Sequence, residues 1–80
     1  MNELFVKKLL EFYQYCLDTV RDRDQQYGSL WESCPISDLE ALLRIKARKL
    51  AAKAVKGTVN IDDVCDVVNY FIMLEVRRGK

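Results

Sequence analysis

Histidine is absent from this sequence of 80 residues, and its absence removes several kinds of chemistry at once. A Cys-His or Ser-His catalytic pair needs an imidazole as its base, and the usual nitrogen ligand of protein-bound zinc is missing too. Any chemistry that this chain carries out must therefore use carboxylates, amines or hydroxyls.

Cysteine is scarce as well. The three cysteines, at positions 16, 34 and 65, are odd in number and far apart in the sequence. They cannot form a complete disulfide framework, and they lack the close pairs of a zinc knuckle. We expect them to be buried, reduced thiols.

The chain also lacks a long apolar run and a strong charge of one sign. Half of its residues are hydrophobic and 31 % are charged, with a formal net charge of +1. This composition is globular, and it argues against a uniformly basic nucleic-acid binder. Glu3, Lys7 and Lys8 interrupt the apolar N-terminus, so we expect neither a signal peptide nor a membrane span. The simplest interpretation is a soluble, cytoplasmic protein with no membrane partner.

Breaks in the chain are few, since glycine and proline together account for four residues. Between them, apolar residues recur at spacings of three and four, the period of an amphipathic helix. The pattern predicts one all-α domain over residues 1–80, with helices at about 2–24, 38–56 and 61–77.

Signals for helix ends support these bounds. Ser37, followed three residues later by Glu40, has the form of a capping box for the second helix. Gly57 ends that helix, because glycine adopts the left-handed conformation without strain. Thr58 or Asn60 caps the third helix.

The apolar faces of the helices are broad. In the first helix the apolar residues from Phe5 to Val20 cover about half the circumference, which predicts a side facing a core. In the third helix they spread over roughly 200°, more than one neighbouring helix can cover. Leu30 and Trp31 are expected to pack back on the helices. Because a chain of 80 residues forms a thin core alone, we expect a helical bundle completed by homodimerisation or a higher oligomer.

One face of the third helix is acidic. It carries Asp62, Asp63 and Asp66, with Asn69 and Tyr70 beside them. Residues three or four apart on a helix are neighbours, so these carboxylates could converge on Mg²⁺, which prefers oxygen ligands. The alternative is a solvated acidic face or an ion pair with a lysine of the second helix.

A basic stripe follows the second helix. It consists of Lys46, Lys49, Lys53 and Lys56, and residues 38–57 hold six basic residues against two acidic ones. Such a stripe could bind the phosphates of a nucleotide, together with Asn69 and Tyr70, or those of a nucleic acid. It could equally be a solvated face whose long side chains cover apolar surface.

Several short motifs resemble a known family. They are Arg23-Asp24 with Tyr27-Gly28 and Trp31, then Leu43-Arg44-Ile45-Lys46 through Lys49-Leu50, and then Ile61 to Tyr70. Over roughly residues 20–76 the pattern resembles the small phage and prophage nucleotide modification associated domain, a group similar to the all-α, MazG-like nucleoside triphosphate pyrophosphohydrolases.

This resemblance implies a dimeric helical bundle, of viral or mobile-element type, that handles nucleotides with Mg²⁺. Asp63 and Asp66 match the acidic pair of the later helix, and Lys46 and Lys49 match basic positions of the preceding one. The hydrolases also carry a pair of glutamates, three apart, on an earlier helix, and this sequence lacks that pair. Whether the chain is an enzyme is left open, and a nucleotide-binding derivative without catalysis is the alternative.

A second resemblance points to a different class. Ala47 through Ala54, then Gly57-Thr58-Val59 and Asp63-Val64, look like the end of the long helix and the following loop of archaeal histones. This implies a dimeric, non-enzymatic DNA-binding protein. A viral module that binds a host protein through its broad apolar face is a further non-enzymatic alternative.

Overall fold

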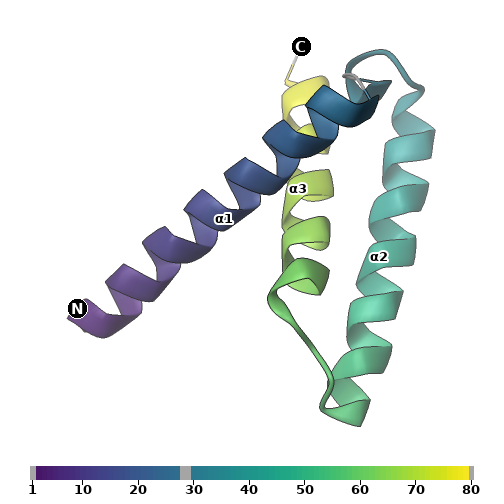
Figure 1. The fold of residues 1–80 in the computed structure, drawn as a ribbon. Helices are drawn as coiled ribbons and strands as arrows, with labels where there is room; N and C mark the ends of the chain where they lie inside the picture. The colour runs from purple at the N-terminus through teal and green to yellow at the C-terminus, as the bar shows by residue number, and fades with distance from the viewer. Residues whose placement is uncertain (1, 28–29, 80) are drawn as a thin grey trace.

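The structure, a computed structural model, describes residues 2–27 and 30–79, without the side chains of residues 23–27. Its elements are α1 (Glu3–Tyr27), the short 3₁₀ helix η1 (Leu30–Glu32), α2 (Ile36–Lys56) and α3 (Ile61–Arg78) (Figure 1). No strand occurs in these described ranges, so the predicted all-α class with three long helices is confirmed. None of the helices in this part of the chain is long and apolar enough to cross a membrane. The motif from Arg23 to Gly28 falls outside the described side chains.

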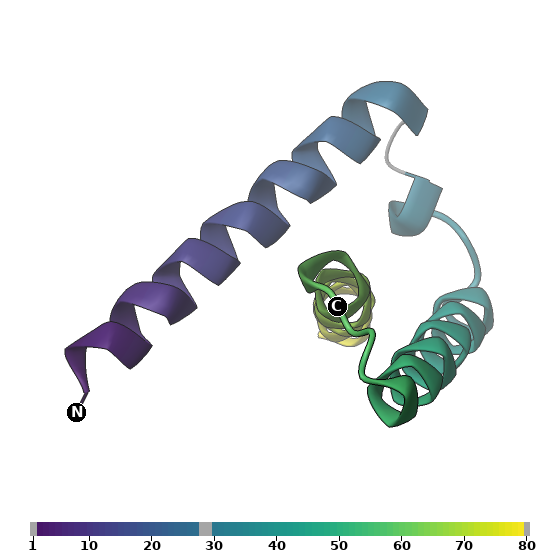
Figure 2. The same ribbon diagram turned by 60° about the horizontal axis from the view of Figure 1, so that its bottom comes forward.

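The third helix is central in the fold. α3 lies between α1 and α2, with its most extensive contact on α2 and a shorter one on α1. α2 and α3 run side by side, whereas α1 crosses α3 and its N-terminal half projects away from both (Figures 1 and 2). The molecule is therefore elongated, with principal extents of 38 × 27 × 26 Å.

The start of α2 differs from the prediction. The helix begins at Ile36, directly after Pro35, and the backbone N–H of Asp38 donates to the Pro35 carbonyl over 2.9 Å. The proposed capping box of Ser37 and Glu40 is wrong, because Ser37 already lies in the first helical turn. The fixed φ of proline, here −57°, suits a helix start and takes the place of a side-chain cap.

The turn between α2 and α3 follows the prediction closely. Gly57 has a φ of 71°, the left-handed conformation, and its N–H donates to the Ala54 carbonyl over 3.2 Å. α3 then begins at Ile61, as predicted, with Asn60 as its N-cap. This short turn holds α2 and α3 as a helical hairpin.

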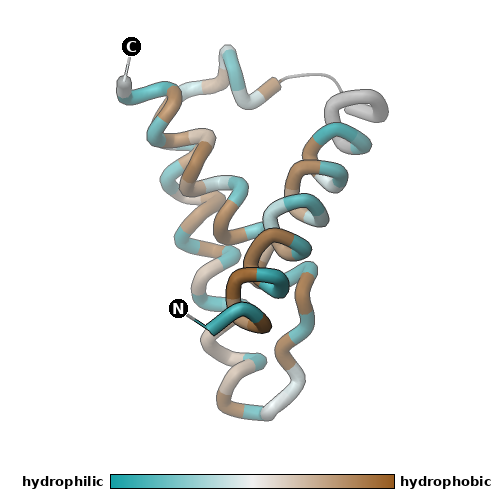
Figure 3. The backbone as a smooth tube through the Cα atoms, turned by 90° about the vertical axis from the view of Figure 1, so that its left-hand side faces the viewer, coloured by the Kyte–Doolittle hydropathy of each residue, from teal (hydrophilic) through white to brown (hydrophobic). Residues whose placement is uncertain are grey.

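The core is thin. Among the described residues, the buried apolar ones are Cys16, Leu39, Cys65 and Leu74. The predicted core-facing side of α1 is only partly covered, since every residue from position 2 to 11 is exposed, including Phe5 at 58 %. Trp31 is half-buried, but Leu30 is 69 % exposed and does not pack back as expected. Among the described side chains of α1, hydrophobic positions recur into the N-terminal half that projects away from α3 (Figures 1 and 3).

The exposed surface is large for the mass of the chain. It amounts to 6058 Å², whereas a compact monomer of this mass exposes about 5,000 Å². The radius of gyration is 13.9 Å, against about 12 Å for a compact domain of this length. The isolated chain is thus less compact than a self-sufficient domain.

Candidate functional site

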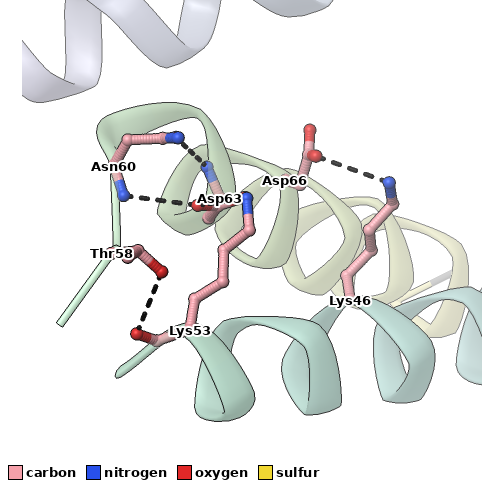
Figure 4. A network of polar contacts seen from close by, with 6 residues as sticks. All are labelled: Lys46, Lys53, Thr58, Asn60, Asp63 and Asp66. Atoms are coloured by element: carbon pink, nitrogen blue, oxygen red, sulfur yellow. Dashed lines mark hydrogen bonds and ion pairs between the residues drawn. The ribbon is translucent and has the colours of Figure 1, made fainter. Parts of the chain in front are cut away.

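Two lysines of α2 meet two aspartates of α3, and we call these four residues the lysine–aspartate seam. Lys53 Nζ lies 2.9 Å from Asp63 Oδ1 and 3.1 Å from Oδ2, and Lys46 Nζ lies 3.5 Å from Asp66 Oδ2 (Figure 4). The aspartate side chains are 9 % and 13 % exposed, and the lysine side chains 31 % and 29 %. The seam is therefore a partly buried pair of ion pairs along the contact between the two helices.

Asp63 has a second role at the start of α3. Its backbone N–H donates to Asn60 Oδ1 over 3.2 Å, and its Oδ2 accepts from the Asn60 backbone N–H over 3.3 Å (Figure 4). This reciprocal arrangement is a capping box. The carboxylate of Asp63 is thus engaged by both Lys53 and the backbone.

These contacts change the acidity of Asp63. Lys53, which donates to both carboxylate oxygens, lowers the pKa of Asp63 below its ordinary value, and burial acts in the opposite direction. The N–H of Asn60 and the charge of the nearby Lys49 lower it further. The seam therefore favours an ionised carboxylate at this position.

We expect Lys53→Gln to raise the pKa of Asp63 toward the ordinary value of about 3.9. A carboxylate whose pKa is depressed in the folded state contributes stability above its unfolded pKa, and this contribution is lost as the pH falls through the folded pKa. The stability difference between the native protein and the variant should therefore be constant near neutral pH and shrink below about pH 4. Carboxyl-carbon NMR titration and urea unfolding at several pH values measure the two effects.

Lys49→Gln is the matched control for this prediction, because Lys49 acts on Asp63 through charge alone, without a hydrogen bond. It should shift the pKa of Asp63 less than Lys53→Gln does. Equal shifts in the two variants would contradict the assignment of the hydrogen bond as the main cause.

The other predicted site residues are spread over α2 and α3. Asp62 accepts a hydrogen bond from the hydroxyl of Tyr15 in α1, which raises the pKa of that hydroxyl. Tyr70 is half-buried, and Lys49 and Lys56 are exposed on α2. In the described residues, no group of three His, Cys, Asp or Glu side chains gathers closely enough to hold a metal ion. The structure thus brings Lys46 and Lys53 to Asp66 and Asp63, while Asp62 turns to α1.

An apolar groove lies between α1 and α3, and Trp31 of η1 contributes to its lining. We call it the α1–α3 groove. Its volume is about 420 Å³, and its lining includes Tyr13, Leu17, Trp31, Asn69 and Ile72. Asn69, predicted at the acidic face, is 8 % exposed and belongs to this groove. The N–H groups of Trp31 Nε1 and Asn69 Nδ2 are buried, and neither has an acceptor among the residues that the structure describes. A lining of this kind is suited to apolar contact rather than to phosphate.

A disulfide joins Cys16 of α1 to Cys65 of α3, beside the groove, with the two Cα atoms 5.3 Å apart. The expectation of three reduced thiols is therefore wrong for this pair. The two residues are 49 positions apart, and only the crossing of α1 over α3 brings them together. Cys34 is free and half-buried, near the carbonyl of Trp31.

No direct signal in the sequence predicts the groove. Its walls come from three elements, and the side chains that form it read as an ordinary helical core in the sequence. The available signal was the excess of apolar residues on the first and third helices, which indicated unfilled surface without locating it.

Comparison with known proteins found no match for this chain. No family model, curated protein or solved structure matches it. The resemblances to MazG-like proteins and to histones accordingly rest on their short motifs.

Proposed function

We propose that this chain is a non-enzymatic binding module that works by associating with itself through the apolar surfaces of α1 and α3. The observation that carries the proposal is the excess of exposed surface. The chain exposes 6058 Å², about 1,000 Å² more than a compact monomer, and a typical stable interface buries about 800 Å² on each partner. The excess is thus the size of one interface.

The composition of that surface supports the proposal. Phe5 is 58 % exposed, Leu10 62 %, Tyr13 55 % and Ile72 52 %. These side chains lie on the two helices that border the groove, so their burial in a contact would remove apolar area from water. A second copy would also supply core that the thin interior of one chain lacks.

Nucleotide binding would require residues of the lysine–aspartate seam to give up their contacts with one another. A phosphate at Lys53 would displace Asp63, and Mg²⁺ at Asp63 would compete with Lys53 and with the N–H of Asn60. Each displacement breaks a charge-assisted contact in a partly buried place, which costs free energy. We therefore rank nucleotide or nucleic-acid binding, with MazG-like hydrolysis or histone-like packaging, behind self-association.

Sedimentation velocity over micromolar to near-millimolar concentration tests the proposal. We expect the mass to rise from 9.3 kDa at high dilution to a multiple of that value. A mass of 9.3 kDa at every concentration would overturn the proposal. A further run with a nucleoside triphosphate and Mg²⁺ separates the alternatives, because assembly that appears only with nucleotide would support the nucleotide hypothesis instead.

A further inference from the structure

The N-terminal half of α1 is left uncovered by the described residues of the chain. Residues 3–11, which we call the α1 arm, are all exposed and project away from α2 and α3 (Figures 1 and 2). An exposed helix of this length gains little from its own hydrogen bonds in water, and helices of this kind are usually stabilised by packing. The arm is therefore a segment of helix that needs a partner.

The apolar residues of α1 form two neighbouring stripes. Phe5, Leu9, Phe12 and Cys16 form the first stripe, at spacings of four, three and four, and Cys16 ties it to α3 through the disulfide. The second stripe consists of Val6, Leu10, Tyr13 and Leu17, which are 36 %, 62 %, 55 % and 43 % exposed. Their spacings of four, three and four residues are those of the seam of a coiled coil. The second stripe is thus open along its whole length.

The two ends of this stripe have different surroundings. Val6 and Leu10 belong to the arm, whereas Tyr13 and Leu17 form one wall of the α1–α3 groove. A second α1 that runs parallel to the first would pair arm with arm and keep each arm out of the groove of the other chain. An antiparallel α1 would lay each arm along the groove of the other chain and cover both features at once.

We infer that two copies of this chain pair through antiparallel α1 helices, each arm lying in the α1–α3 groove of the other copy. The inference rests on the self-association proposed above and adds its geometry. The spacings of the second stripe, four, three and four residues, are the same in either chain direction. Antiparallel pairing therefore places Val6 opposite Leu17 and Leu10 opposite Tyr13 of the second copy. The two-fold axis then passes near Phe12, and the contact is isologous, as in most homodimers.

The exposed surface area of the chain favours a second copy as the occupant of the α1–α3 groove. Each chain contributes one arm and one groove, so the two contacts are equal and the assembly closes as a dimer. The excess surface of about 1,000 Å² per chain matches what one side of a stable dimer buries.

Charged substitutions at the outer pair test this register. Val6→Glu alone and Leu17→Lys alone should each weaken dimerisation by about 100-fold or more, because each places a charge at two symmetry-related apolar contacts. The double variant Val6→Glu/Leu17→Lys should recover most of the affinity, since every Glu would face a Lys. Sedimentation velocity gives the dissociation constants, and circular dichroism checks that helix content is retained.

Mixing experiments give the matched control. Val6→Glu mixed with Leu17→Lys should form a heterodimer, whereas Val6→Glu mixed with Val6→Lys should not. Heterodimers only in the second mixture would overturn the antiparallel register in favour of a parallel one. A dimer that neither single substitution weakens would overturn the inference while leaving self-association intact, and a native chain that is monomeric throughout would remove both.

Discussion

Reduction of the Cys16–Cys65 disulfide is expected to lower the free energy of unfolding by about 4 kcal/mol, the loop-entropy value for a ring of about 50 residues. The disulfide joins residues 49 apart, so it restricts most of the unfolded chain. It also fastens α1, whose contact with the helical hairpin is otherwise short. An 80-residue domain has a total stability of only several kcal/mol, so reduction should remove much of it.

Urea unfolding with and without a dithiol reductant, at one protein concentration, measures this effect. Cys34→Ser is the control, because Cys34 is free and its replacement leaves the disulfide intact. Its midpoint should stay close to that of the native protein, and reductant should shift the midpoint of this variant as much as that of the native chain. Equal unfolding curves for the oxidised and reduced protein would contradict the prediction. Disulfides persist mainly in oxidising compartments. A large shift would therefore argue against the expected cytoplasmic location.

Leu74→Ala is expected to cost about 3 kcal/mol of unfolding free energy. Leu74 is 2 % exposed and lies at the α2–α3 contact, where it shares a wall with Leu43 and Ala47. Truncation removes apolar contact and leaves a cavity in a core that has few other members to fill it. The urea midpoint should fall accordingly.

Ile45→Ala provides the comparison, because Ile45 is 57 % exposed on α2. Its loss of free energy should be below about 1 kcal/mol, within the range of surface substitutions. A similar loss for Leu74→Ala and Ile45→Ala would mean that the α2–α3 contact is not the core of the chain.

Helix identity was predictable from the sequence because it depends on local signals. The period of apolar residues predicted three helices, and Gly57 and Asn60 fixed the turn between α2 and α3. Ser37 misled the prediction, because its capping motif lies two residues after the actual N-cap, Pro35. Pro35 already starts that helix, and a proline sets the backbone more strongly than a hydroxyl cap.

The site was harder to predict because its members are distant in sequence. The pairing of Lys53 with Asp63 was foreseeable, since both lie close to one tight turn between neighbouring helices. The Cys16–Cys65 contact and the groove depend on the angle at which α1 crosses α3, and no local pattern specifies that angle. Asn69 was placed with the acidic residues by its position on the helix, but it lies at the border between the two faces of α3.

The central position of α3 implies an order of folding. α2 and α3 are joined by a few residues, so they can meet with little loss of chain entropy, whereas α1 must find α3 across a long intervening segment. The hairpin should therefore form early, and its exposed α3 face would offer α1 a ready template. Oxidation of the two thiols would then come last, after α1 has packed on α3 in its native position.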